Sequence, residues 1–277
     1  MKKILLVVLA AVMALSCFAC GKKDETVDIN AKSEGVMTYA EYEAAPLESK
    51  VTIEAYIQAK QSWWDNKGTF YTQDGDGAYF LYELPCTEEE YAKLAIGTKV
   101  KVSGTKTAWS GEVEIVDATW EILEGTYVAE AKDVTALLGS EELIMSQNMF
   151  VSFKGMTVEA SKDANGNDVP YLYKWDGSGQ DGDDLYFNVS INGQTYNFTV
   201  ESYLCGKDTA VYQAVKGLKI GDKIDMEGFL YWYEGVNPPH HRCNSRRLIL
   251  KNGIHKAPPD TDCVGRGFFV PGFFKTS

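Results

Sequence analysis

Apolar and polar side chains alternate along several short stretches of the first half of the chain, and Gly- and Asp-rich segments separate them. Alternation of this kind is typical of strands that bury one face. We therefore expect strands at residues 51–57, 68–73, 78–84, 98–104 and 112–120. Asp74-Gly75-Asp76-Gly77 predicts a tight hairpin turn between the second and third strands. Thr87 and Glu90 have the spacing of a capping box, which predicts a short helix between the third and fourth strands.

The chain repeats this pattern. Residues 96–104 (IGTKVKVSG) match residues 220–228 (IGDKIDMEG), and residues 51–57 match residues 151–157 at a shorter offset. The second copy is longer, because residues 176–184 and a second hairpin at Asn192-Gly193 expand its middle. A repeat of this length predicts two copies of one structural unit.

Three strands, a short helix and two further strands form the order of the OB-fold, a small five-stranded barrel. The pattern resembles the OB-fold repeats of secreted bacterial proteins and lipoproteins, and it covers both copies. It is carried by ten residues: Gly68, Phe70, Asp74, Gly75, Gly77, Ile96, Gly97, Val100, Val102 and Gly104. The resemblance implies a mostly β protein with two tandem five-stranded OB barrels, each with a short helix between its third and fourth strands.

This organisation divides the chain into six parts. We expect a signal peptide at 1–19, a flexible tether at 20–35, a first OB unit at 36–123, a linker with a short helix at 124–146, a second OB unit at 147–238 and an aberrant tail at 239–277. As written, the second unit lacks its fifth strand.

The tail differs in composition from everything before it. All three His, all four Arg and five of the eight Pro lie after Asn237. One extra C in the codons of Pro238-Pro239 would explain this, because the restored frame encodes a short β-branched segment where the fifth strand belongs. We therefore interpret residues 239–277 as a frameshift product, with an open sheet edge into which residues 247–250 are drawn. The alternative is a native basic tail that binds an anionic partner.

The N-terminus predicts export. Met-Lys-Lys is followed by an uncharged apolar run at residues 4–15, too short for the roughly 20 residues that span a bilayer. The next residues resemble a bacterial lipoprotein signal, with Cys20 as the acylated residue and Cys17 where the motif usually has Leu. The resemblance implies a cell-membrane protein that is lipid-anchored on the extracytoplasmic face. The alternative is a signal peptide that is cleaved without lipidation.

Charge and residue types limit the chemistry of residues 20–237. They contain 18 Lys against 37 acidic residues and no His. This acidity disfavours nucleic acid as a partner, since its binding grooves are basic. Without His there is no His base, Ser-His or Cys-His nucleophile or His metal site, so we expect no enzyme.

Two other groups of residues could bind a metal or form a disulfide. Asp163 to Asp168 alternate oxygen ligands as a Ca²⁺ loop does, although the Gly and Glu of an EF-hand are missing. We expect an acidic turn there and no cofactor, with Ca²⁺ as the alternative. Cys86 and Cys205 occupy equivalent places in the two units, which favours separate packing over a disulfide.

Aromatic residues are the strongest candidates for ligand binding. On an OB barrel the loops after strand one and between strands four and five flank the binding face formed by strands two and three. Aromatic side chains at such places stack on bases or sugars. The candidate residues are Trp63, Trp64, Tyr71, Tyr79, Trp109, Tyr173, Trp175, Trp232 and Tyr233.

Three interpretations of function remain open. The first is a surface-anchored binding protein for a small molecule, glycan or peptide. The second is a single-stranded nucleic-acid binder, the usual activity associated with the fold, which a basic groove built from Lys60, Lys67, Lys99 and Lys106 would favour. The third is a structural scaffold in a membrane-associated protein complex.

Overall fold

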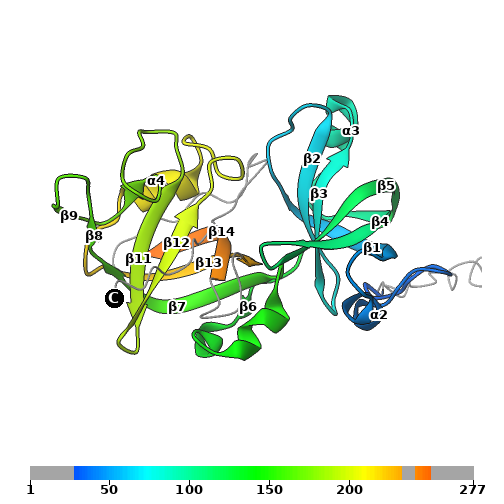
Figure 1. The fold of residues 1–277 in the computed structure, drawn as a ribbon, viewed down its shortest axis with the longest axis horizontal. Helices are drawn as coiled ribbons and strands as arrows, with labels where there is room; N and C mark the ends of the chain where they lie inside the picture. Colours follow the sequence, from blue (N-terminus) through cyan, green and yellow to red (C-terminus); the bar gives the residue numbers. More distant parts are fainter. Residues whose placement is uncertain (1–27, 233–240, 251–277) are drawn as a thin grey trace, which may run out of the picture.

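A computed structural model of the chain describes residues 28–232 and the strand at 241–250. Two lobes lie side by side, the first built from β1–β5 and the second from β7–β14 (Figure 1). The predicted signal peptide, Cys20, Tyr233 and the remaining residues of the tail lie outside the described residues.

The first unit is a closed barrel with the strand order β1-β2-β3-β5-β4, in which β3 and β5 run parallel. This is the OB order that the sequence predicts. Its elements are α2 (Tyr39–Ala44), β1 (Lys50–Lys60), β2 (Lys67–Gln73), β3 (Ala78–Pro85), α3 (Glu88–Lys93), β4 (Thr98–Trp109) and β5 (Glu112–Thr126). The fourth and fifth strands are longer than expected, because β4 continues to Trp109, which pairs with Glu112, and β5 continues to Thr126, which pairs with Thr98.

The predicted capping box is formed at α3. The Thr87 hydroxyl accepts a hydrogen bond from the backbone N–H of Glu90 at 3.2 Å, and the Glu90 carboxylate accepts one from the N–H of Thr87 at 2.8 Å. The two bonds satisfy N–H groups that the first turn of a helix leaves without partners. They also hold the pKa of Glu90 below its ordinary value.

A linker joins the two units, and Figure 1 shows its short helices and β6 below β7. It contains the short strand β6 (Lys132–Asp133) and two 3-10 helices, η1 (Thr135–Leu137) and η2 (Glu141–Ser146). β6 pairs in parallel with β7, so the linker is part of the second sheet.

The second unit repeats the strand order of the first but is not a second closed barrel. Its elements are β7 (Phe150–Glu159), β8 (Ser161–Lys162), β9 (Asp168–Val169), β10 (Leu172–Tyr173), β11 (Leu185–Ile191), β12 (Gln194–Val200), α4 (Ala210–Lys216), β13 (Lys223–Trp232) and β14 (His241–Leu250). Six of these strands and β6 of the linker form a seven-stranded sheet with the order β10-β11-β7-β13-β14, in which β12 pairs with β11 and β6 with β7. Strands β8 and β9 pair with each other in a separate two-stranded sheet. Within the described strands, no backbone pairing joins β12 to β14, so the sheet does not close there. The insertion contributes β10, which pairs with Leu185 and Tyr186 at the start of β11, whereas β7 pairs with Asn188 to Ser190 farther along the same strand.

Strand β14 occupies the place beside β13 that β5 occupies beside β4. It includes residues 247–250, whose backbone pairs with Ile224–Glu227. Residues 247–250 are thus drawn onto this edge as expected, and the pairing continues to His241, so the edge of β13 is not left open. The frameshift origin of residues 239–277 stays a prediction.

Equivalent glycines confirm the internal repeat. Gly97 and Gly221 precede the matching strands β4 and β13, and their φ angles are +89° and +90°. Only glycine adopts such a φ without strain, so both units need it at the same turn.

Each unit has its own hydrophobic core. Cys86 lies in the first core and Cys205 in the second, each as a thiol. Burial raises the pKa of Cys86 to about 11, which makes it an unreactive packing residue.

Candidate functional site: the junction of the two units

A third hydrophobic cluster joins the two units. Phe70 and Tyr79 point into the barrel, whereas the alternate residues Tyr71 and Phe80 point outward from the same strands. That outer face is not solvent-exposed, because side chains of the second unit cover it. The cluster contains Ala59, Tyr71, Phe80, Ala129, Phe150, Leu204, Phe229 and Tyr231.

Aromatic rings make the closest contacts across this junction. Tyr71 stacks on Phe229 with ring centroids 4.6 Å apart, and Phe80 meets Tyr231 edge-on at 5.5 Å. Tyr71 and Phe229 are fully buried. Stacked and edge-on pairs of this kind add stabilisation beyond the area they bury. The face that an OB barrel commonly offers to ligands is here an intramolecular interface.

Three polar side chains of the barrel satisfy backbone N–H groups of the linker and the second unit. Gln58 accepts a hydrogen bond from the N–H of Ala129 at 2.9 Å, and Gln73 accepts one from the N–H of Phe150 at 2.9 Å. Glu112 accepts one from the N–H of Trp232 at 2.6 Å. Buried N–H groups need such partners, so these bonds fix how the two units sit against each other.

The predicted ligand-binding aromatics that the structure describes separate into three groups, which are buried, half-buried and exposed. Tyr71, Tyr79 and Trp232 are buried, so the prediction that they stack on a ligand is corrected: these side chains pack inside the protein. Trp63 is half-buried and donates its indole N–H to the Cys86 carbonyl at 2.9 Å, and Tyr173 is half-buried in an edge-on pair with Tyr171.

The three remaining described candidates are exposed: Trp64 at 80%, Trp175 at 64% and Trp109 at 52%. Tyr203, which the sequence does not single out, is exposed at 65%.

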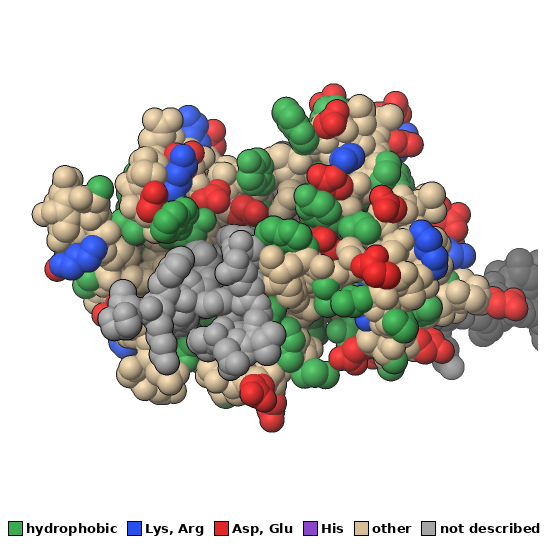
Figure 2. Space-filling view, viewed as in Figure 1, with side chains coloured by type: hydrophobic (Ala, Val, Ile, Leu, Met, Phe, Trp, Pro, Cys, Tyr) green, Lys and Arg blue, Asp and Glu red, His purple; other side chains and the backbone are tan. Residues whose placement is uncertain are grey.

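Hydrogen bonds connect the three segments that carry Trp64, Tyr203 and Trp175. Both the N–H and the hydroxyl of Ser62 donate to the Tyr203 carbonyl, at 2.9 and 3.0 Å. The Asp184 carboxylate accepts hydrogen bonds from the N–H and the hydroxyl of Ser202. The backbone carbonyl of Asp184 accepts a hydrogen bond from the N–H of Lys174. We call Trp64, Trp175 and Tyr203 the aromatic rim. Figure 2 shows hydrophobic side chains, with acidic ones beside them, along the edge where the two lobes meet.

Trp109 comes from another turn of the barrel. It ends β4 at the turn to β5, and the carbonyl of the nearby Gly111 accepts a hydrogen bond from the Gln147 amide at 3.0 Å. Trp109 is therefore not counted in the aromatic rim.

The four lysines that could form a basic groove are all engaged elsewhere. Lys60 is buried and donates to the Tyr91 carbonyl, and Lys106 is buried and donates to three carbonyls at the end of α2. Lys67 pairs with Glu83 at 2.7 Å, and Lys99 pairs with Glu54 at 3.0 Å. Burial lowers the pKa of both Lys60 and Lys106.

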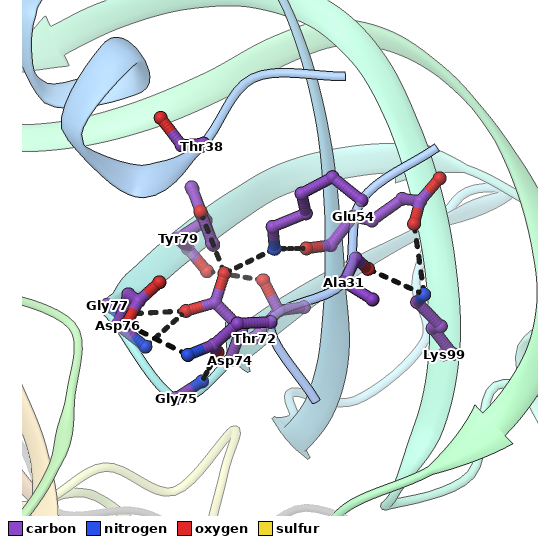
Figure 3. A network of polar contacts seen from close by, with 12 residues as sticks. Ala31, Thr38, Glu54, Thr72, Asp74, Gly75, Asp76, Gly77, Tyr79 and Lys99 are labelled. Atoms are coloured by element: carbon purple, nitrogen blue, oxygen red, sulfur yellow. Dashed lines mark hydrogen bonds and ion pairs between the residues drawn. The ribbon is translucent and has the colours of Figure 1, made fainter. Parts of the chain in front are cut away.

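The Asp74 motif is a structural network (Figure 3). One carboxylate oxygen of Asp74 accepts from the N–H groups of Asp76 and Gly77, each at 2.8 Å, which closes the predicted turn. The other oxygen accepts from the Lys32 ammonium at 2.6 Å and the Tyr79 hydroxyl at 3.0 Å. A Cβ at Gly77 would lie 2.2 Å from the Tyr39 ring, so the motif glycine leaves room for α2.

The same network holds the N-terminal segment against the barrel. Lys32 also donates to the Glu54 carbonyl at 2.7 Å, and Lys99 donates to the Ala31 carbonyl. Burial alone would raise the pKa of Glu54, but the neighbouring Ser33 and the charge of Lys99, whose ammonium lies 3.0 Å from the carboxylate, hold it below its ordinary value.

The acidic loop that resembles a Ca²⁺ site is closed by its own side chains. Asp163 accepts from the N–H groups of Asn165 and Asn167 and from the Asn167 amide. Across the described part of the chain, no group of three or more His, Cys, Asp or Glu is arranged to hold a metal ion. None of the described helices has the length and apolarity needed to cross a bilayer.

The fold defines a mostly β protein built on a closed OB-type barrel. No protein-family model matches the chain, and neither does any curated protein. Solved structures with some likeness include the Ifi202 HINa domain in complex with 20-bp dsDNA, at 9% identity and a TM-score of 0.34, covering 70% of this chain and 91% of that one. A murine DNA-binding protein bound to dsDNA aligns at 13% identity and a TM-score of 0.33, covering 82% and 98%. At these TM-scores the alignments carry no argument about this protein.

Proposed function

We propose that this protein is a non-enzymatic binding protein that takes its ligand at the aromatic rim. The exposure of Trp64 and Tyr203 on two hydrogen-bonded segments from different units carries this proposal. Large rings are normally buried, and exposed Trp and Tyr side chains supply much of the binding energy where proteins meet ligands. The junction beneath them supplies rigidity, which lowers the entropy lost on binding.

The side chains beside the rim favour a neutral or cationic ligand rather than an anion. Gln61 donates to Glu201 at 3.1 Å beside Tyr203, while Asp65 and Asn66 follow Trp64 directly. Planar amides and carboxylates with exposed aromatic rings suit a glycan, a peptide or another small polar molecule. A structural scaffold role would instead need a protein partner on the same surface.

Single-stranded nucleic acid remains the alternative ligand. Its backbone needs Lys or Arg along the binding path, and its bases stack on aromatic rings as the rim would allow. The engagement of Lys60, Lys67, Lys99 and Lys106 supports the glycan or peptide over nucleic acid. Titrating the protein with a glycan or peptide and, separately, with an oligonucleotide distinguishes the two ligand classes.

Replacing Trp64 tests the site. We expect Trp64→Ala to weaken binding of a cell-wall glycan fragment or peptide by about 10-fold or more, because an exposed aromatic anchor contributes on the order of 2 kcal/mol. The measurement is quenching of Trp fluorescence on titration, with an oligonucleotide as the second ligand. The matched control is Trp109→Ala, an exposed Trp outside the rim segments. Equal losses in both variants, or none in Trp64→Ala, would contradict the placement of the site.

We further propose that the protein is lipidated at Cys20. Only seven residues separate Cys20 from Asp28, the first described residue, so a lipid there would hold the first unit close to the membrane surface. We expect Cys20→Ser to release the protein from the membrane fraction or to stop its processing. Fractionation and immunoblotting measure this, and unchanged membrane retention would refute the anchor.

A further inference from the structure

The carboxyl group of Glu112 lies fully buried at the junction of the two units. It begins β5 of the barrel, and its Oε2 accepts hydrogen bonds from the N–H of Trp232 at 2.6 Å and from the Gln147 amide at 3.2 Å. Trp232 ends β13 of the second unit, and Gln147 follows η2 of the linker. One carboxyl group therefore contacts the barrel, the linker and the second unit.

Two oxygen atoms at this place lack hydrogen-bond donors. Within the described residues, neither Oε1 of Glu112 nor Oδ1 of Asn148 has a hydrogen-bond partner, and both atoms are buried. The Asn148 side chain contacts Glu112, and its Nδ2 donates to the Val113 carbonyl at 3.2 Å. Two unsatisfied buried acceptors in one small polar cluster are costly, and an ionised carboxylate makes that cost larger.

Within residues 28–232, the titratable groups that face Glu112 offer no positive charge to balance an ionised carboxylate. Glu114 faces it from its own strand and Tyr42 from α2, and Glu83 faces Glu114 in turn. Lys106 on the neighbouring strand directs its ammonium at the carbonyls of Tyr42, Glu43 and Ala45. Gln147, Asn148 and the Trp232 backbone are uncharged.

We propose that Glu112 is a protonated carboxyl group that latches the two units together, and that its ionisation loosens the junction. One proton on Oε1 turns an unsatisfied acceptor into a donor, and the Asn148 side chain, which contacts Glu112, offers in Oδ1 an acceptor that lacks a donor. Oε2 meanwhile continues to accept from Trp232 and Gln147. The proton thus removes a buried charge and satisfies the polar cluster in a single step.

The direction of the pKa agrees with this arrangement. Burial raises the pKa of Glu112 well above its ordinary 4.5, although the hydrogen bonds from Trp232 and Gln147 and the nearby Asn148 side chain act in the opposite direction. The unfolded chain releases this proton near pH 4.5, whereas the folded protein keeps it. The stabilisation is therefore fully present below about pH 4.5, declines as pH rises, and is lost once pH exceeds the folded-state pKa.

Carboxyl NMR and hydrogen exchange on the full-length protein test the latch. We expect the Glu112 side-chain carboxyl carbon, assigned by its loss in Glu112→Gln, to have the chemical shift of a protonated acid at pH 7. Exchange of the Trp232 amide, corrected for its intrinsic pH dependence, should accelerate by about 10-fold or more when Glu112 ionises, which corresponds to roughly 1.4 kcal/mol of lost stabilisation.

Two variants sharpen the result. Glu112→Gln has the shape and hydrogen-bonding pattern of the protonated acid, so its Trp232 exchange should stay slow at every pH. Glu114→Gln removes the neighbouring acid, whose pKa burial raises to about 7, and should leave the acceleration in place. An ordinary ionised Glu112 at pH 7, or an acceleration that persists in Glu112→Gln, would overturn the proposal. The wild-type carboxyl signal decides the protonation state even if a variant fails to fold.

Discussion

Phe229→Ala is expected to lower the free energy of unfolding by about 3–5 kcal/mol, the usual cost of removing a buried Phe side chain. The Phe229 ring is fully buried, stacks on Tyr71 at 4.6 Å and lies 5.2 Å from Phe150. Its loss leaves a cavity between the units that neither rigid strand can close. Urea denaturation followed by near-ultraviolet circular dichroism measures the change.

Tyr82→Ala serves as the control for this variant. Tyr82 lies on β3 two residues after Phe80, with its ring centroid 6.4 Å from that of Phe80, but it is 41% exposed and is not part of the buried junction cluster. We expect its loss to cost less than about 1 kcal/mol, as is usual for partly exposed surface side chains. Equal losses for Phe229→Ala and Tyr82→Ala would show that the junction contributes little to stability.

Asp74→Ala is the second variant with a large expected effect. Its removal leaves the buried Lys32 ammonium and Tyr79 hydroxyl without their partner and opens the 74–77 turn. Breaking a buried ion pair from one side typically costs about 3–5 kcal/mol, because the remaining charge stays desolvated. Thermal or urea unfolding measures the loss.

Asp76→Ala is its matched control in the same turn. The Asp76 carboxylate accepts only from the exposed Asn30 amide, at 2.9 Å, so we expect a loss of about 1 kcal/mol or less. A small effect for Asp74→Ala, similar to that of Asp76→Ala, would mean that the network in Figure 3 does not stabilise the barrel.

The first barrel could be predicted because its local signals agree with its fold. The Asp-Gly turn at 74–77, the capping box at Thr87 and Glu90 and the two matching segments at 96–104 and 220–228 all act over short distances in sequence. The second unit was harder, because its insertion adds β8–β10 and its last strand falls in the tail. No local sequence pattern predicts which edge strands of its sheet pair with each other.

The sequence analysis does not predict that the second unit covers the outer face of β2 and β3, although one sequence feature indicates it. Ala78-Tyr79-Phe80-Leu81-Tyr82 is an unbroken apolar run, and such runs are typical of strands that are buried on both faces. The expectation that Tyr71 and Tyr79 belong to one binding face overlooks this run. Alternation along the strand places Tyr79 in the core and Phe80 at the junction.

No local sequence pattern predicts the role of Tyr203 in the aromatic rim or the burial of Glu112. Tyr203 follows a strand as a single aromatic residue, and its importance arises only because Ser62 lies against its carbonyl. Glu112 begins a strand after a Gly turn, where a carboxylate is usually solvated. Its burial depends on residues 35 to 120 positions away in the sequence, which no local pattern can reveal.

A double-mutant cycle on Tyr71 and Phe229 tests most directly that the second unit covers the outer face of the barrel. The free energies of unfolding of the wild type, Tyr71→Ala, Phe229→Ala and the double variant are measured by urea denaturation. Stacking of the two rings predicts a coupling of about 1 kcal/mol, so the double variant loses less than the sum of the single losses. Additive losses, within about 0.3 kcal/mol, would mean that the two rings do not meet and that the units are not joined at this face.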